Sequence, residues 1–299
     1  MRLAQEKGLV IPAFNVAYLP MLEPIALTLK KIETFGLIEV ARPDVEKFGA
    51  KSFAEVAREY KRWADLNFMR LHLDHVPVID EDGKKAPWKK IIEECLNLGY
   101  DSVMIDGSRL PLEENIAVTK EVVKMAHPKN VPVEAELGAV LGHEKGPLPP
   151  YEELFCTGRG FTSVDEAQRF VQETGVDWLS VAIGNIHGAI SVATKDQAKV
   201  EARLNIDHLR KLREITGIPL VLHGGSGINR TSVLEGIKNG ITKINIGTEI
   251  RQAYERGLKE RPDDITWAKQ KVALKIEELI RGYYGIEGSA LRLADIPKG

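Results

Sequence analysis

Eight short runs of apolar and β-branched residues recur along this chain, and each is followed by a longer segment with the apolar spacing of an amphipathic helix. This alternation predicts repeated strand–helix units. Eight such units within about 250 residues are what a closed (β/α)8 barrel, the TIM-barrel architecture, requires, and an open doubly wound sheet is the alternative fold. The predicted strands cover residues 9–15, 36–41, 68–75, 100–107, 131–138, 176–184, 218–225 and 241–248.

Signals for helix boundaries lie between the predicted strands. A serine followed three residues later by a glutamate, the pattern of a capping box, occurs at Ser52 and Ser163. Glycines typical of helix ends occur at Gly36, Gly175, Gly217 and Gly240. No Gly/Ser-rich linker and no change in composition divides the chain, so we expect a single domain over residues 1–299.

Two segments fall outside the strand–helix pattern. Residues 143–161 are rich in glycine and proline and show neither helical nor strand periodicity, so we expect a mobile active-site loop there. A polar helical pattern covers about 266–284, and an irregular tail follows it. The last part of the chain, about 262–299, is therefore expected to form a C-terminal helical extension.

Charge and cysteine content exclude several classes of protein. The 41 basic and 43 acidic side chains give a formal net charge of −2, which argues against an extended contact with nucleic acid. Cys95 and Cys156 are too few for a disulfide framework, and no run approaches the roughly 18 apolar residues of a membrane span. We therefore expect a cytoplasmic protein that binds neither nucleic acid nor a membrane.

Three histidines, His75, His187 and His223, close three different predicted strands. In a (β/α)8 barrel the C-terminal ends of all strands meet at one rim, where catalytic groups are found. Three imidazoles that converge there and leave a fourth position open are a common catalytic zinc site. Each histidine alone would more often serve only the structure of the rim, but their shared position at strand ends favours the metal site.

Acidic residues occur at the same strand ends. Asp74 precedes the first of these histidines, so its carboxylate is expected either to exchange a proton with a substrate hydroxyl or to orient a histidine. Asp106, Glu134 and Glu136 remain open to three interpretations: metal ligands, groups that orient the ligands, or a polar layer of the barrel. We include Asp106 and Glu136 among the candidate metal ligands.

Glycine-rich strand ends indicate a phosphate site. HGGSG at 223–227 and NIGT at 245–248 offer free backbone N–H groups and hydroxyls after the seventh and eighth strands, where barrel enzymes often bind phosphate. A phosphorylated substrate is therefore expected. For a second, distal phosphate we assign Arg42, at the end of the second strand, although an arginine there is more often solvated or paired with a carboxylate.

One lysine, Lys243, is placed in phase with Asn245 on the eighth strand. A lysine at such a strand end is the nucleophile of a Schiff-base mechanism. We favour the alternative, in which Lys243 lies inside the barrel and pairs with a carboxylate.

Eight short motifs follow one another along about residues 9–250. They are PAFN at 12–15, LHLDH at 71–75, SVMIDGS at 102–108, EEN at 113–115, VEAELG at 133–138, GVDWLSVAIGNIHG at 175–188, LVLHGGSG at 220–227 and KINIGTE at 243–249. In this order they resemble the strand-end signatures of the class II, metal-dependent ketose-bisphosphate aldolases. The resemblance implies a carbon–carbon lyase of carbohydrate metabolism, such as glycolysis, that cleaves fructose or tagatose 1,6-bisphosphate into dihydroxyacetone phosphate and glyceraldehyde 3-phosphate. We further expect a homodimer or homotetramer.

The resemblance also implies roles for individual residues. The three histidines would hold Zn²⁺, or another divalent metal, and Asp74 would be the acid/base for the C4 hydroxyl. Glu144, in the predicted loop, matches a glutamate that exchanges the C3 proton of the enediolate. A monovalent cation, Na⁺ or K⁺, often accompanies the substrate, and Asn15 is a further candidate for substrate contact. Positions that match the dihydroxyacetone-phosphate site are Gly188, Gly224, Gly225, Ser226, Asn245, Gly247 and Thr248.

The chain departs from the family pattern around the aldehyde side. Ala41 stands where a serine or threonine is usual, Val76 replaces a frequent glycine, and Gly247 replaces an aspartate or alanine. A charged insertion covers 77–90. These departures leave two alternatives: another metal-dependent phosphosugar enzyme on the same barrel, or a phosphosugar-binding protein with weak or no aldolase activity. The sequence does not distinguish fructose from tagatose bisphosphate.

Overall fold

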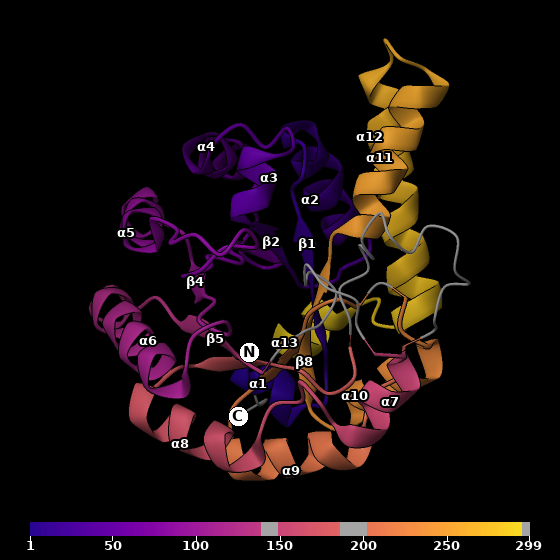
Figure 1. The fold of residues 1–299 in the computed structure, drawn as a ribbon. Coiled ribbons are helices and arrows are strands. Elements are labelled where there is room, and N and C mark those ends of the chain that lie inside the picture. The colour runs from indigo at the N-terminus through magenta and orange to yellow at the C-terminus, as the bar shows by residue number, and fades with distance from the viewer. Residues whose placement is uncertain (139–148, 186–201, 226, 295–299) are drawn as a thin grey trace, which may run out of the picture.

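Eight parallel strands pair in sequence order, and β8 pairs with β1 to close a barrel (Figure 1). The computed structural model describes residues 1–138, 149–185, 202–225 and 227–294. This topology confirms the predicted (β/α)8 barrel and excludes the open sheet. The strands are β1 Ile11–Asn15, β2 Gly36–Val40, β3 Met69–Leu73, β4 Ser102–Ile105, β5 Val133–Leu137, β6 Trp178–Val181, β7 Leu220–Leu222 and β8 Ile241–Ile246.

Helices surround the barrel in the alternation expected from the sequence (Figure 1). Among the helices of the described ranges, none combines the length and hydropathy of a membrane span. The helices are α1 Arg2–Glu6, α2 Leu22–Lys31, α3 Arg42–Glu46, α4 Phe53–Trp63, α5 Trp88–Leu98, α6 Leu112–Ala126, α7 Tyr151–Thr157, α8 Val164–Thr174, α9 Ile206–Thr216, α10 Arg230–Lys238, α11 Thr248–Glu260, α12 Ile265–Glu277 and α13 Ser289–Ala294.

Both predicted capping serines begin a helix. The Ser52 hydroxyl accepts the backbone N–H of Glu55 at 3.1 Å at the start of α4, and the Ser163 hydroxyl accepts that of Glu166 at 3.4 Å at the start of α8. These bonds satisfy donors that the first helical turn leaves without an intrahelical acceptor.

Two of the four predicted capping glycines end a helix. Gly175 and Gly217 adopt the left-handed conformation after α8 and α9, with φ of 69° and 63°. The prediction was wrong for Gly36, which is the first residue of β2. Gly240 comes one residue after the C-cap of α10, because this helix ends at Lys238 and Asn239 is its C-cap; its φ is 127°.

The structure corrects the predicted loop at 143–161. Residues Tyr151–Thr157 form α7, which begins after Pro150 and ends at Gly158 in the left-handed conformation, with φ of 66°. Acidic side chains in the first turn add to these local helix signals. These helix signals outweigh the glycine and proline content on which the prediction relied. The part of the predicted loop at 143–148 lies outside the described residues.

The C-terminal part is helical, as expected, over Ile265–Glu277 and a π-helical continuation at Glu278–Tyr284. The tail is not wholly irregular, because α13 follows and the Ser289 hydroxyl accepts the backbone N–H of Phe35 at 3.2 Å. Helices α11 and α12 pack along each other and α12 along α2. Figure 1 shows the α11–α12 pair projecting beyond the barrel.

The inside of the barrel changes from apolar to polar along its axis. A small apolar cluster closes the end at which the strands begin, and α1 contributes Ala4 to this floor. The next inward-facing positions are buried and polar, with Glu39 and His72 paired in register across β2 and β3. The floor consists of Ala4, Leu9, Ile11, Ala13, Leu37, Trp178 and Val221.

Candidate active site

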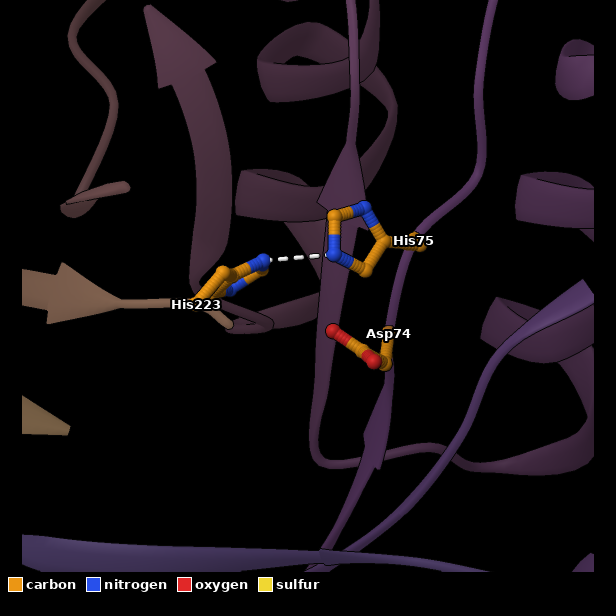
Figure 2. A group of neighbouring side chains, drawn as sticks. All are labelled: Asp74, His75 and His223. Carbon is orange, nitrogen blue, oxygen red and sulfur yellow. Dashed lines mark hydrogen bonds between the residues drawn. The ribbon is translucent and has the colours of Figure 1, made fainter. Parts of the chain in front are cut away.

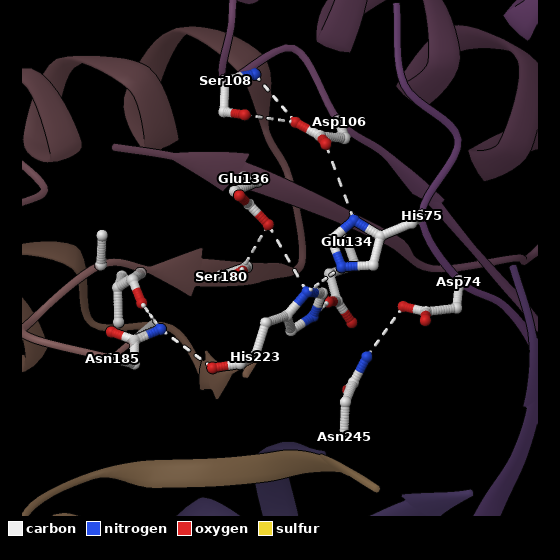
Figure 3. Close-up of polar contacts among 12 residues, drawn as sticks. Asp74, His75, Asp106, Ser108, Glu134, Glu136, Ser180, Asn185, His223 and Asn245 are labelled. Atoms are coloured by element: carbon white, nitrogen blue, oxygen red, sulfur yellow. Dashed lines mark hydrogen bonds and ion pairs between the residues drawn. The ribbon is translucent and has the colours of Figure 1, made fainter. Parts of the chain in front are cut away.

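Polar side chains from six strands meet at the C-terminal rim of the barrel, and Figure 3 shows those of them that surround His75 and His223. Each lies within the last residues of a strand or directly after it, because parallel strands in a closed barrel end on the same side. The structure thus brings together most of the described residues that the sequence places at strand ends. They are Asn15 on β1, Asp74 and His75 after β3, Asp106 after β4, Glu136 on β5, His223 after β7 and Asn245 on β8.

Two of the predicted metal-binding histidines face each other. His223 Nδ1 lies 2.6 Å from His75 Nε2, and the ring centroids are 4.3 Å apart (Figure 2). Ligand atoms of Asp74, His75 and His223 all lie within 4.8 Å of one another. This set of donors brings two imidazole nitrogens and a carboxylate oxygen close together, which fits a divalent metal such as zinc.

The opposite nitrogen of each imidazole contacts a carboxylate. His223 Nε2 lies 2.8 Å from Glu134 Oε1, and His75 Nδ1 lies 3.6 Å from Asp106 Oδ2 (Figure 3). Asp106 is held in turn by the backbone N–H of Ser108 at 3.0 Å and its hydroxyl at 2.6 Å. Carboxylates in this position orient metal-binding histidines and raise their basicity.

Asp74 is held at both carboxylate oxygens. Asn15 Nδ2 donates to Oδ2 at 2.9 Å, and Asn245 Nδ2 donates to Oδ1 at 2.9 Å. Burial alone would raise the pKa of Asp74, but the positive charges of His75 and Lys243 outweigh it and place the pKa below its usual range. Asp74 is therefore an ionised, oriented base beside the histidine pair.

Glu136 lies close enough to the histidines to bind a metal itself. Its Oε2 is 3.5 Å from His223 Nδ1 and accepts the Ser180 hydroxyl at 3.1 Å. His75, Asp106 and Glu136 form a second group with ligand atoms within 4.8 Å. Burial, followed by repulsion from Asp106, raises the pKa of Glu136 to about 8, so without a metal this carboxyl holds a proton at neutral pH.

A charged layer lies inside the barrel beneath this rim. Lys243 Nζ is 3.0 Å from Glu134 Oε2 and 3.3 Å from Glu39 Oε2, and all three side chains are fully buried. His72 Nδ1 contacts the Ser102 hydroxyl at 2.8 Å. These ion pairs confirm the interpretation of Lys243 as a barrel-interior lysine paired with carboxylates.

The candidate phosphate-binding residues follow the adjacent strands β7 and β8. Gly224, with φ of +65°, and Gly225 come after β7, while Gly247 and Thr248 form the N-terminus of α11. A helix N-terminus with free N–H groups favours an anion. A Cβ on Gly247 would lie 3.0 Å from Asn15 Oδ1, so the glycine leaves room for the asparagine that holds Asp74.

Arg42 is the first residue of α3, where its guanidinium meets two carboxylates. Nε lies 2.6 Å from Glu46 Oε1, and Nη1 lies 3.6 Å from Asp80 Oδ2. The carboxylate-paired alternative is therefore what the structure contains.

Four predicted site residues lie outside the described part of the chain: Glu144, His187, Gly188 and Ser226. The last described residue before His187 and Gly188 is Asn185, which is buried and donates from Nδ2 to the carbonyl oxygen of His223 at 2.9 Å. The end of β6 is thus tied to the backbone of a candidate metal ligand.

Sequence reasoning missed three buried polar residues near the site. Glu39 and His72 belong to the charged layer, and Asp44, on α3, accepts the backbone N–H of Ala41 at 2.8 Å and lies 3.5 Å from Asn15 Nδ2. Burial is the main cause that raises the pKa of Asp44 to about 6. For Glu39 the available signal was a single charged residue in a strand that is otherwise apolar, and for His72 it was a polar residue between two leucines.

Known proteins of similar sequence are fructose-bisphosphate aldolases. Fructose-bisphosphate aldolase from Streptococcus pneumoniae is 31% identical over 301 residues, covering 98% of this chain and 94% of that protein. The enzyme from Streptococcus pyogenes serotype M1 is 33% identical over 260 residues, covering 86% of this chain and 80% of that protein.

Solved structures show the same fold. The YdjI aldolase from Escherichia coli K12 superimposes with a TM-score of 0.74 at 29% identity, covering 96% of this chain and 95% of that one. Fructose-bisphosphate aldolase from Campylobacter jejuni, at 18% identity, gives a TM-score of 0.71 over 95% of this chain and 93% of that one. A model of the family described as fructose-bisphosphate aldolase class-II matches residues 1–290, and the chain therefore belongs to this family of metal-dependent carbon–carbon lyases.

Proposed function

We propose that this chain is a zinc-dependent aldolase that cleaves fructose or tagatose 1,6-bisphosphate into dihydroxyacetone phosphate and glyceraldehyde 3-phosphate. The observation that carries the proposal is the 2.6 Å approach of His223 Nδ1 to His75 Nε2 beside Asp74. In this proposal His75, His187 and His223 hold the ion. Asp106 and Glu136 either form a second set of metal ligands together with His75 or orient the histidines that hold the ion.

The residues around this point divide the chemistry between them. A bound divalent ion supplies Lewis-acid polarisation of the ketone and offsets the charge of the enediolate. Asp74, held by Asn15 and Asn245, takes the proton of the C4 hydroxyl while the C3–C4 bond breaks and the aldehyde leaves. Glu144 then delivers a proton to C3 of the enediolate, which completes dihydroxyacetone phosphate.

The phosphate of the ketone half is assigned to the loops after β6, β7 and β8. Free backbone N–H groups and the N-terminus of α11 support this assignment. A monovalent cation, Na⁺ or K⁺, is proposed beside this phosphate, and Arg42 is proposed for the distal one. The residues of the ketone-side site are Asn15, Gly188, Gly224, Gly225, Ser226, Asn245, Gly247 and Thr248.

We also propose a cytoplasmic homodimer or homotetramer. Its support is the projecting α11–α12 pair (Figure 1), on which at least half of the surface of Ile265 and Leu274 is exposed. Cys95 and Cys156 are both unpaired, as expected in a reducing compartment. Light scattering on the purified protein measures the assembly.

The test is cleavage of both bisphosphates, assayed side by side with a dehydrogenase coupled to dihydroxyacetone phosphate. We expect turnover of at least one substrate, loss of turnover after chelation and recovery with zinc. An epimerised product without cleavage would indicate another phosphosugar enzyme. Binding of dihydroxyacetone phosphate without turnover of either bisphosphate would indicate a binding protein.

A further inference from the structure

A lysine is buried inside the barrel beneath the two facing histidines. Lys243 forms ion pairs with Glu134 and Glu39, and no part of the three side chains is exposed. Removing such charges from water costs free energy that their attraction only partly returns, and apolar side chains of similar size are often at least as stabilising. Stability alone therefore does not explain why a lysine occupies position 243. The contacts of this lysine connect it to residues nearer the rim.

Glu134 connects this lysine to the histidine pair. Its Oε1 lies 2.8 Å from His223 Nε2 (Figure 3), and its Oε2 lies 3.0 Å from Lys243 Nζ. An ionised carboxylate only accepts hydrogen bonds, so this contact places the imidazole proton on Nε2. The lone pair then remains on Nδ1, the nitrogen that faces His75.

We propose that Lys243 is a positioning residue for the metal centre. By holding Oε2 of Glu134, the ammonium keeps Oε1 against His223 and fixes the tautomer that presents Nδ1 to a metal. The inference rests on the proposed function in taking His223 as a metal ligand. Without the ammonium, Oε2 of Glu134 still has His72 Nε2 at 3.4 Å as a partner among the described residues. The carboxylate of Glu134 is then free to turn away from His223 and toward His72.

The variant Lys243→Met tests the proposal because it removes the charge and keeps an unbranched side chain. We expect its zinc affinity, measured by competition with a chromogenic chelator, to fall about 10–100-fold, as is typical when a group that orients a ligand is lost. Glu39→Gln is the matched control, because it removes the other carboxylate at Lys243 and leaves Glu134 on His223; its zinc affinity should stay within about twofold. Wild-type affinity in Lys243→Met would overturn the proposal.

A double variant separates positioning from charge balance. Lys243→Met combined with Glu39→Gln removes the ammonium together with the second carboxyl group that faces it. We expect zinc binding to stay weak in this variant even where its melting temperature returns to that of the wild type. Recovery of both quantities together would show that Lys243 only balances charge, against the proposal.

The tautomer itself is measurable without zinc and without activity. In ¹⁵N-histidine spectra of the metal-free wild-type protein, we expect His223, assigned by the loss of its signals in His223→Ala, as the Nε2–H tautomer alone. A mixture of tautomers in the wild type would overturn the proposal even if every Lys243 variant unfolds. If the wild type binds no zinc, the metal centre fails, but a comparison of this spectrum with that of metal-free Lys243→Met still decides whether Lys243 fixes the tautomer.

Discussion

Asn245 of β8 and Asp74 after β3 meet across the mouth of the barrel, where Asn245 Nδ2 donates to Asp74 Oδ1 at 2.9 Å. With Asn15 on the other oxygen, the carboxylate has no freedom to rotate without losing a hydrogen bond. A base that is fixed before substrate arrives does not lose conformational entropy on reaction.

Asp74→Asn is expected to keep zinc and lose about 10²–10⁴-fold in cleavage rate, because an amide preserves the shape but cannot accept the hydroxyl proton. Metal analysis and steady-state kinetics of the purified variant measure both quantities. Near wild-type turnover would remove Asp74 from proton transfer.

Replacing His75, His187 or His223 by alanine is expected to lower bound zinc together with activity, because a site of three protein ligands loses most of its affinity with any one of them. His127→Ala is the control: this histidine is half exposed and contacts Asp177 at 2.8 Å, away from the rim. Stoichiometric zinc and normal turnover in all three rim variants would refute the metal site.

Glu144→Gln should slow the exchange of solvent hydrogen into dihydroxyacetone phosphate, since this exchange requires a group that protonates and deprotonates C3. Mass spectrometry of dihydroxyacetone phosphate incubated with the enzyme in deuterated water measures it. An unchanged exchange rate would mean that another residue transfers the C3 proton.

Arg42→Ala should raise KM for a bisphosphate about tenfold and leave the affinity for dihydroxyacetone phosphate nearly unchanged, if Arg42 holds the distal phosphate. Its ion pair with Glu46 is partly exposed, and such a pair is weak enough for a phosphate dianion to compete. Lys47→Ala, which breaks a neighbouring ion pair with Glu81, is the control. Equal losses for both ligands would give Arg42 a structural role instead.

Asp44→Asn tests a buried carboxyl beside the site. The pKa of Asp44 is about 6 in the folded protein against an ordinary value of 3.8, so the folded state binds this proton more tightly than the unfolded chain does. The stability due to this group is fully present below pH 3.8 and is lost as the pH rises through 6. Asparagine keeps the acceptor for Ala41 and carries no charge, so at pH 8 the variant should be more stable than the wild type by roughly 1–3 kcal/mol.

Urea unfolding of the metal-free proteins at pH 4 and pH 8 measures this difference. The advantage of Asp44→Asn should appear at the higher pH and vanish at the lower one. A difference that does not depend on pH would mean that Asp44 titrates at its ordinary pKa.

The order of elements and much of the rim were predictable from the sequence. The eighth strand illustrates why: its alternation places Lys243 and Asn245 on the inner face, and closure of the barrel brings the end of that face to the rim. Strand bounds were less predictable. The run at 218–225 forms hydrogen-bonded strand only over Leu220–Leu222, because the polar residues that follow leave the ladder for the site.

The contacts within the charged layer were not predictable. Glu39 and Glu134 are far apart in sequence, and the stagger between strands, which a local pattern does not encode, decides that both meet Lys243. Helix α7 was missed for the opposite reason. Its short helical signal stands beside prolines and glycines that dominate a composition-based reading of that segment.

The apolar floor separates the polar interior of the barrel from solvent at the end where the strands begin. Trp178 and the apolar side chains around it lie beneath His72 and Lys243, so among the described residues the polar groups of the barrel interior continue toward the rim and not toward the bottom. A ligand that fills the mouth would therefore isolate the charged layer from bulk solvent. While the ligand stays bound, the charged layer would neither gain nor lose protons. Its protonation state would remain the one it had when the ligand bound.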